Sequence, residues 1–526
     1  MRRLLSLTLA TETSGMSQSR GWIGLVLLSF VIRLCLAGWI QAAPEEAYYW
    51  NYAQRPSLGY YDHPPAVAWM IWCATRLAGN NDFALRLGPL FCAAMASFFV
   101  YQLAYRRWRD VNAGWRAVAL LNLLPIFAGT GYFAFPDAPL MAAWSAAVYF
   151  GYRAVETGRI RFWLLWGAAA GCALLSKYTG GALLLAAGAF LLLTPEGRVQ
   201  LRKPGIYLGL LAALVVFSPV VWWNWQHEWM SFRFQFAGRH SRGIDFSLPL
   251  LLVLESSAVT PVAFVLFVIL AAIAMRRREW QDRWLAWQFW PIFLGFAASS
   301  FKEQTHINWI SPGYLSLLVL AQNCLARQPG HADSSLRWRC AAFRWSVAIG
   351  AVATCWIALY LAGFLPRTSV PPSLAHRLAP QFFWKDIAED IDRIQNKLLS
   401  ASGVKTFSLA VDKYYLASEI AYYDPEKDWA RSTSRNMIGE HAVAWNLWTV
   451  PEDFEGRNSV IVGFDPRNLS DEQLQPFFKS LGPIQAVEAN EDAPARHGLH
   501  YRLGYNYQHQ HGAEQPAASA LKEDKP

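Results

Sequence analysis

The chain has 526 residues and a formal net charge of +9, with 54% hydrophobic and only 16% charged side chains. An ordinary soluble domain carries about 25% charged residues, so this composition excludes a disordered chain, a disulfide-rich miniprotein and a simple soluble enzyme. The basic residues lie in short clusters between apolar runs. Such clusters are typical of loops beside membrane spans and argue against a nucleic-acid partner. The sequence therefore predicts a membrane protein with a soluble appendage.

Apolar runs recur from residue 21 to residue 365. A transmembrane helix needs about 20 mostly apolar residues, and this criterion predicts eleven spans. Lys and Arg are concentrated in the loops that would share a side with the N-terminus, which predicts a cytoplasmic N-terminus. An odd number of spans then places the C-terminal region outside. The predicted spans are 21–40, 84–104, 114–133, 138–153, 162–176, 179–194, 206–223, 247–274, 286–300, 308–325 and 344–365.

The region after residue 365 changes character. Pro366, Pro371 and Pro372 mark a linker, and helical and strand patterns then alternate, which predicts a small α/β domain. The string Asp390-Ile391-Asp392 falls on an amphipathic helix and is interpreted as a solvated face, not as a metal–nucleotide motif. The predicted helices are 381–400, 414–423 and 471–480, and the predicted strands are 406–411, 442–447, 459–464 and 499–505.

The expected fold is thus a polytopic α-helical membrane protein with about 11 transmembrane helices and a small C-terminal α/β domain outside the cytoplasm. Its end is polar, which predicts disorder there. The predicted parts are a cytoplasmic tail (1–20), a transmembrane domain (21–365), an extracytoplasmic α/β domain (366–507) and a disordered tail (508–526).

Polar residues collect in the loops on one side of the predicted membrane. Because polar groups at membrane depth are costly, their presence at span ends marks a candidate site. The loops that supply them lie far apart in the sequence, so the fold is expected to bring them together at one face. They are 44–50 with 59–65, 135–139, 176–179, 222–227 and 301–309.

These loops contain the groups that a group-transfer reaction needs. A carboxylate can take the proton of an acceptor hydroxyl, cations can hold a departing phosphate, and aromatic faces suit sugar rings. Each residue also has a plainer interpretation. Asp137 could cap a helix, Lys177 and Lys302 could extend along the span to reach water, and a Glu in an outer loop could simply be solvated. Trp and Tyr at span ends are typical of interface belts.

Three segments together resemble a known family: Glu45-Glu46-Ala47-Tyr48-Tyr49-Trp50, Asp62-His63-Pro64-Pro65 and Phe135-Pro136-Asp137-Ala138-Pro139. They are similar to the glycosyltransferase family 39-like membrane enzymes of GT-C fold, which include protein O-mannosyltransferases and the aminoarabinose transferase of lipid A. The likeness runs from about Pro44 to Tyr314. It implies a bacterial inner-membrane enzyme with a periplasmic C-terminal domain. The implied reaction moves a sugar from a polyprenyl-phosphate donor to an acceptor, with inversion.

The resemblance also implies roles for residues. The family carries an Asp-Glu pair where this chain has Glu45-Glu46, so either glutamate is a candidate base. Asp137 matches the second acidic position and would place the acceptor or the base. Some relatives use a lysine near the lipid phosphate where this chain has His63. The full set of expected substrate and phosphate contacts is Tyr60, Asp62, His63, Arg86, Lys177, Lys302, His306 and Asn308.

No cofactor is required by this reaction. Some relatives place a metal near the equivalent of Asp62, and Asp62 with His63 or His306 is the corresponding candidate for a divalent metal here. The expected partners are the lipid-linked donor, membrane lipids, and lipid A, another glycolipid, a glycan or a protein as acceptor. Two other classes stay open. A transporter or flippase of lipid-linked sugars predicts repeated halves with matching broken helices, and a membrane subunit without catalysis is permitted by the departure at Glu45.

Overall fold

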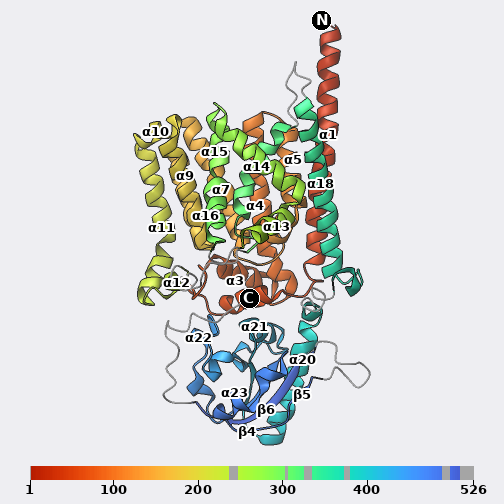
Figure 1. Cartoon of the computed structure of the whole chain (residues 1–526), viewed down its shortest axis with the longest axis vertical. Coiled ribbons are helices and arrows are strands. Elements are labelled where there is room, and N and C mark those ends of the chain that lie inside the picture. The colour runs from red at the N-terminus through yellow and green to blue at the C-terminus, as the bar shows by residue number, and fades with distance from the viewer. Residues whose placement is uncertain are drawn as a thin grey trace.

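The computed structural model describes residues 2–235, 247–301, 306–324, 334–371, 379–487 and 498–509. A bundle of helices forms one end of the molecule and a smaller α/β region forms the other (Figure 1). The N-terminal part of α1 projects from the bundle at the end away from the α/β region. Helices α1 (Arg2–Leu36) and α18 (Ser334–Leu361) run side by side along one edge of the bundle.

Helices occupy every described segment in which a span was predicted, and many begin with a proline in the first turn, where the missing N–H costs nothing. The further helices of the bundle are α2 (Pro44–Ala53), α3 (Ala66–Ala78), α4 (Asp82–Trp108), α5 (Val111–Leu123), α6 (Pro125–Thr130), α7 (Asp137–Thr157), α8 (Ile160–Ser176), η1 (Tyr178–Gly180), α9 (Gly181–Leu193), α10 (Pro195–Leu201), α11 (Pro204–Gln226), α12 (Met230–Arg233), α13 (Leu248–Val259), α14 (Pro261–Arg276), α15 (Trp280–Trp287), α16 (Trp290–Ser299), α17 (Ser311–Leu320) and η3 (Ala321–Cys324).

Four of the described helices are by themselves long and apolar enough to cross a membrane: α1, α4, α11 and α18. Two more spans result if the bent pairs are counted, in which η1 and α9 meet α10 at 104° and α13 meets α14 at 103°. Several of the remaining helices are short, so the prediction of eleven spans stays a prediction. The chain is a largely helical protein with several apolar candidate spans.

Close helix packing in the bundle depends on small residues. Helices α8 and α11 pack along each other, and a Cβ added at Gly167 would lie 1.8 Å from the carbonyl oxygen of Gly209. Small residues allow two backbones to approach in this way. Helix α8 ends at Ser176, and Lys177 follows directly after that end.

The α/β region contains a six-stranded mixed sheet of order β2-β1-β3-β6-β4, with β5 paired to β6. Strands β1, β2 and β3 are parallel, and β6 runs antiparallel to β3, β4 and β5. Helices α20 and α21 pack on the sheet. The bounds are α20 (Trp384–Ser402), β1 (Thr406–Ala410), α21 (Tyr414–Tyr423), β2 (Ser432–Ser434), β3 (Asn458–Gly463), β4 (Phe478–Leu481), β5 (Gln485–Ala486) and β6 (His500–Tyr507).

Two predicted elements of this region are wrong. The segment predicted as a strand at 442–447 is a turn that leads into α22 (Trp445–Trp448), because the Asn446 side chain accepts a hydrogen bond from the Ala442 backbone at 2.9 Å. The helix predicted at 471–480 is instead the short helix α23 (Asp471–Leu474) and the 3-10 turn η10 (Gln475–Phe477), after which the chain enters β4 at Phe478. The tail predicted from 508 lies, from residue 510 on, outside the described residues, and residues 2–20 belong to the helix α1.

Candidate active site

The two glutamates that begin α2 have different surroundings. Glu46 is fully buried, and its carboxylate accepts hydrogen bonds from the backbone N–H groups of Ala43 at 2.9 Å and Ala134 at 2.8 Å. The same carboxylate forms an ion pair with Arg86 at 2.9 Å. Glu46 therefore joins α2 to α4 and to the loop before α7.

Arg86 is equally enclosed. One of its terminal nitrogens donates to the carbonyl oxygens of Ala37 and Ile40, at 2.9 and 2.7 Å, and the other donates to Gln41 O and to Glu46. Its side chain has no exposed surface. The sequence predicted a phosphate contact at Arg86, whereas the geometry places its terminal donors on the protein itself.

Glu45, in contrast, reaches solvent. Its side chain is exposed, yet the surrounding protein desolvates the carboxyl and raises its pKa. No other side chain among the described residues pairs with it, so the carboxylate is open to a substrate.

Tyr49 lies one helical turn after Glu45, so the two side chains share a face of α2. Burial raises the pKa of its hydroxyl, and the charge of Asp62 adds to that rise. The charges of Glu45 and Asp137 contribute to the rise of this pKa as well. Sequence reasoning did not select Tyr49, although its spacing from Glu45 on a helix could have indicated it.

Three predicted residues meet in one cluster, in which Asp137 and Lys177 are buried and Asn308 is half-buried. Asp137, at the first turn of α7, accepts hydrogen bonds from the Lys177 ammonium at 2.9 and 3.1 Å and from the Asn308 amide at 2.8 Å. Lys177 is nearly buried, so it does not extend toward water. The N-cap of α7 is Pro136 rather than Asp137. The cluster thus joins the start of α7 and the end of α8 to the segment just before α17.

The loop between α2 and α3 holds Asp62 beside α2. Its carboxylate accepts hydrogen bonds from the hydroxyls of Tyr48 and Tyr52, and its carbonyl oxygen accepts one from the Gln235 amide at 2.6 Å. The loop can approach α11 only because residue 59 is glycine, since a Cβ there would lie 2.8 Å from the Trp223 ring. This tyrosine and glutamine shell around Asp62 was not predicted from the sequence.

The remaining predicted residues are Tyr60, His63, His306 and Lys302. The Tyr60 hydroxyl donates to the backbone, and its ring stacks on Tyr52 with 4.0 Å between centroids, so it supports the loop. The His63 ring packs edge-on against Tyr49 at 5.5 Å. His306 is exposed beside Trp309. Lys302 lies outside the described residues.

Within the described part of the chain, no group of three His, Cys, Asp or Glu side chains is arranged to hold a metal ion. Asp62 has tyrosine hydroxyls as partners, and hydroxyl donors favour a carboxylate without a metal. The proposed Asp62–His63 metal site therefore gains no support from this geometry.

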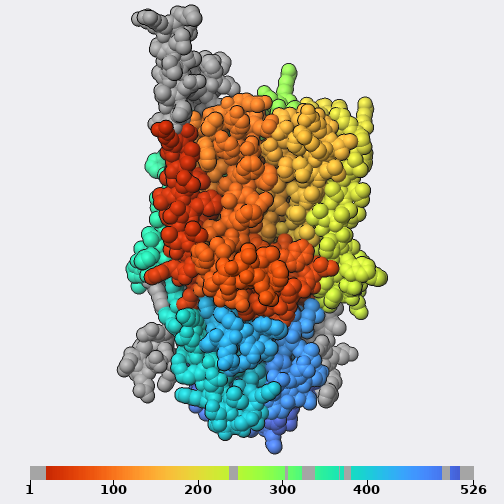
Figure 2. Space-filling model, turned by 180° about the vertical axis from the view of Figure 1, so that it is seen from behind, coloured from red at the N-terminus to blue at the C-terminus, as the bar shows by residue number. Residues whose placement is uncertain are grey.

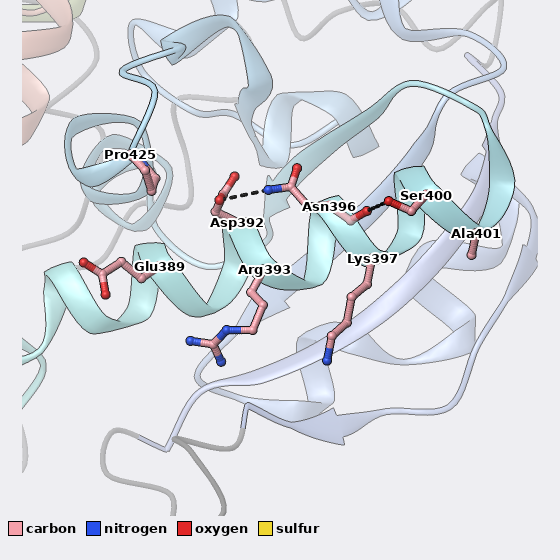
Figure 3. A pocket seen from close by; sticks show the side chains of 8 residues that line it. All are labelled: Glu389, Asp392, Arg393, Asn396, Lys397, Ser400, Ala401 and Pro425. Carbon is pink, nitrogen blue, oxygen red and sulfur yellow. Dashed lines mark hydrogen bonds between the residues drawn. The ribbon is translucent and has the colours of Figure 1, made fainter.

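A hollow on the α/β region lies along α20, away from these residues (Figure 3). It contains the second aspartate of the Asp390-Ile391-Asp392 string. Asp392 pairs with Arg431 at 3.1 Å and accepts a hydrogen bond from Asn396, whereas Asp390 is buried and pairs with Arg393 at 2.9 Å. Both carboxylates are thus used within the domain, and only part of the string faces solvent.

Residues 62–223 match the family model of dolichyl-phosphate-mannose-protein mannosyltransferases. The lipid A galacturonosyltransferase RgtD of Rhizobium johnstonii is 28% identical over 298 residues, which cover 53% of this chain and 59% of that protein. The undecaprenyl phosphate-alpha-4-amino-4-deoxy-L-arabinose arabinosyl transferase of Pseudomonas aeruginosa is 28% identical over 357 residues, covering 60% of this chain and 61% of that protein. The chain thus spans about three fifths of the length of these curated relatives.

Among solved structures, the apo crystal structure of ArnT from Cupriavidus metallidurans covers 92% of this chain and 98% of that chain, with a TM-score of 0.58 and 16% identity. The helical bundle with its α/β region therefore has the GT-C type of fold. These matches confirm the resemblance seen in the sequence to GT-C glycosyltransferases with protein mannosyltransferase-like and ArnT-like members. Its apolar helices and bacterial relatives indicate a bacterial inner-membrane protein.

Proposed function

We propose that this chain transfers a sugar from a polyprenyl-phosphate donor to an acceptor on the periplasmic side of the inner membrane. The observation that carries the proposal is the open carboxylate of Glu45, which shares its surroundings with Tyr49, Asp62 and Asp137. One relative is named as a transferase of lipid A, and the other is named for an undecaprenyl-phosphate-linked sugar. Both names support the same class of reaction. The proposed orientation has the N-terminus in the cytoplasm.

Glu45 is the proposed general base, and Glu46 is assigned to the fold because its carboxylate is already paired. As the acceptor oxygen attacks the anomeric carbon, Glu45 takes the hydroxyl proton. The bond from the anomeric carbon to the phosphate oxygen breaks, and the polyprenyl phosphate leaves with the electron pair. A single in-line displacement inverts the configuration at the anomeric carbon.

The Asp137–Lys177–Asn308 cluster is the proposed support of the acceptor side. A buried ion pair with an added amide donor keeps the carboxylate in one orientation, and fixed groups near a reacting centre lower the barrier without reorganisation. His63 and Lys302 are the proposed phosphate contacts. His63 follows Asp62 in the loop after α2, and its ring lies next to Tyr49 of that helix.

The proposed place of the lipid tail is an apolar groove at the end of α11, next to the loop that carries Tyr60 and Asp62. An isoprenoid chain is apolar and would bury its surface there. The groove is lined by Leu58, Leu214, Ser218, Pro219, Val221, Trp222, Trp225 and Trp229.

Turnover by the purified full chain in lipid nanodiscs tests the proposal. Undecaprenyl-phosphate-linked galacturonic acid and aminoarabinose are offered in turn with lipid A, and products are read by mass spectrometry. The expected result is one mass increment on lipid A with one donor, lost in Glu45→Gln. Absence of transfer or donor hydrolysis with every donor, from protein whose thermal unfolding is cooperative, would contradict the assignment for this acceptor class.

A further inference from the structure

Helix α2, which carries Glu45, is held between the bundle and the α/β region. Eight of its ten residues are buried, and α2 packs on α3 and on α21. Figure 2 shows the cyan and blue α/β region in direct contact with the orange-red surface of the early part of the chain. A helix that is buried over most of its surface takes its position from its neighbours. The placement of Glu45 therefore depends on the α/β region as well as on the bundle.

The contacts of α21 with this part of the chain are specific. The Tyr422 and Tyr423 hydroxyls both donate to the Asp82 carboxylate, at 3.0 and 2.8 Å, and Asp82 begins α4. The Ala42 N–H donates to the Tyr423 hydroxyl at 2.6 Å. The Asn51 amide of α2 donates to Ser418 O of α21 at 3.2 Å. Helix α21 is thus bonded to both ends of the loop and helix that present Glu45.

Aromatic contacts extend this interface. The Tyr48 ring of α2 packs against Tyr414 at 4.5 Å, and Trp50 lies edge-on to Tyr422 at 5.2 Å. Arg55, just after α2, lies over the Trp429 ring at 3.9 Å. Such aromatic and cation–π contacts add to the area that the interface buries.

Glu419 of α21 stands out within this interface. It is fully buried, and both of its carboxyl oxygens are without a hydrogen-bond partner among the described residues. The charged groups that face it are Glu45 and Glu46 from α2 and Asp82 and Arg86 from α4.

Of these four groups only Arg86 is a cation, and it is already paired with Glu46. On its own helix, Glu419 faces the Tyr423 hydroxyl. An ionised Glu419 would be an unpaired buried charge among three other carboxylates, which is strongly unfavourable. Burial, and then the charge of Asp82, raises the pKa of Glu419 well above its usual value.

We propose that α21 is a positioning element of the transfer site and that Glu419, as a neutral carboxylic acid, is the residue on which its contact with α2 depends. Ionisation of Glu419, or its replacement by a charged side chain, separates α21 from α2 and displaces Glu45. The α/β region then controls the activity of a carboxylate that it does not itself carry. The inference rests on the proposed function only where activity is measured.

Hydrogen exchange of the α2 backbone amides in the full chain in nanodiscs is the primary test. Exchange is expressed as protection factors, because the intrinsic base-catalysed exchange of every amide becomes faster at alkaline pH. The wild type is expected to protect α2 near neutral pH and to lose at least 10-fold of that protection at alkaline pH. Glu419→Gln, which mimics the neutral acid, is expected to keep the protection at both pH values, and Glu419→Lys to lack it at both. Glu472→Gln removes an exposed acid of the same region and is expected to follow the wild type.

Activity gives a second readout. Glu419→Lys is expected to lower kcat by about 100-fold, which is typical of a small displacement of a catalytic group, with a smaller effect on KM for undecaprenyl-phosphate-linked sugar. Glu419→Gln is expected to retain kcat and to lose the alkaline decline of the wild type. Equal α2 protection in wild type and Glu419→Gln across the pH range would overturn the inference. If no variant turns over any donor, the exchange result still decides it, and only the transferase proposal fails.

Discussion

At the scale of single residues, the adjacent glutamates of α2 illustrate how neighbours in sequence take different parts. Glu46 has three partners, and its carboxylate is inaccessible, whereas Glu45 is accessible and unpaired among the described residues. The sequence predicted that one of the pair acts as base and left open which one. That choice depends on Arg86 and on the backbone at Ala134, which are distant in sequence.

Glu45→Gln is expected to lower turnover by about 10²–10⁴-fold, the usual contribution of general base catalysis. The amide has nearly the same shape but cannot accept the proton. Thermal unfolding of the variant should match the wild type, because Glu45 is exposed. Turnover measured by mass spectrometry checks the first point. Unchanged turnover would show that another group takes the proton.

Glu46→Gln is expected to have the opposite profile. It removes the charge that pairs with the buried Arg86, and breaking a buried ion pair from one side costs about 3–5 kcal/mol of stability. Chemical or thermal unfolding in nanodiscs measures this loss. A stability equal to that of the wild type would contradict the structural assignment of Glu46.

The pH dependence of turnover follows from the raised pKa of Glu45, whose cause is desolvation by the surrounding protein. A base acts in its ionised form, so kcat/KM is expected to rise with pH through a pKa above the ordinary value of 4.5 and to be lost below it. The profile of Glu45→Gln should lack this acidic limb. If kcat/KM falls only at or below the ordinary pKa of a carboxyl group, the result would contradict the assignment of Glu45 as the base.

Lys177→Met tests the Asp137 cluster. The change leaves the Asp137 carboxylate buried with only the Asn308 amide, which is expected to cost about 3–5 kcal/mol of stability. Asp137→Asn with Lys177→Met should cost less than the sum of the two single changes, because the residues share one interaction. A double-mutant cycle of unfolding free energies measures this, and additivity would contradict a coupled pair.

At the scale of elements, the sequence was informative where a pattern is local. The apolar runs located the helices of the bundle, and the alternation after residue 380 located α20, β1, α21 and β3. The strand predicted at 442–447 failed because Asn446 caps Ala442 in a turn, which no periodicity reveals. The bends that break α9 from α10 and α13 from α14 were also not predicted.

The site was partly predictable for the same reason. Polar residues at span ends identified Asp137, Lys177 and Asn308, and the fold brings these three together. The tyrosines around Asp62 and the contact of α21 with α2 were missed. Tyr48 and Tyr52 looked like interface aromatics, and Glu419 lies far along the chain on a helix that seemed to belong only to the α/β domain.

The interface of α21 with α4 makes a prediction about stability. Tyr423→Phe removes the hydroxyl that donates to the Asp82 carboxylate and accepts from the Ala42 N–H. This loss is expected to lower the free energy of unfolding by about 1–3 kcal/mol. Tyr505→Phe, on β6 of the same region, is the matched control and should change little. Unfolding of both variants followed in parallel checks this, and equal small effects would show that the hydroxyl of Tyr423 contributes nothing to the interface.

At the scale of the whole molecule, the bundle and the α/β region are in direct contact through α2, α4 and α21. Helices α7 and α8 and the segment before α17 supply Asp137, Lys177 and Asn308, helix α2 and the loop after it supply Glu45 and Asp62, and α21 of the α/β region packs on α2. This arrangement assigns the α/β region a part in positioning.

The most direct measurement of the central claim is mass spectrometry of membrane lipids and envelope glycans from cells with and without the gene. Wild-type and Glu45→Gln chains are each returned to the deleted strain. The account predicts that a polyprenyl-phosphate sugar accumulates and that one glycolipid or glycan loses one sugar in the deleted strain. The wild-type chain restores both pools and Glu45→Gln does not. Unchanged pools in the deleted strain, under conditions in which the parent expresses the protein, would contradict the transferase account.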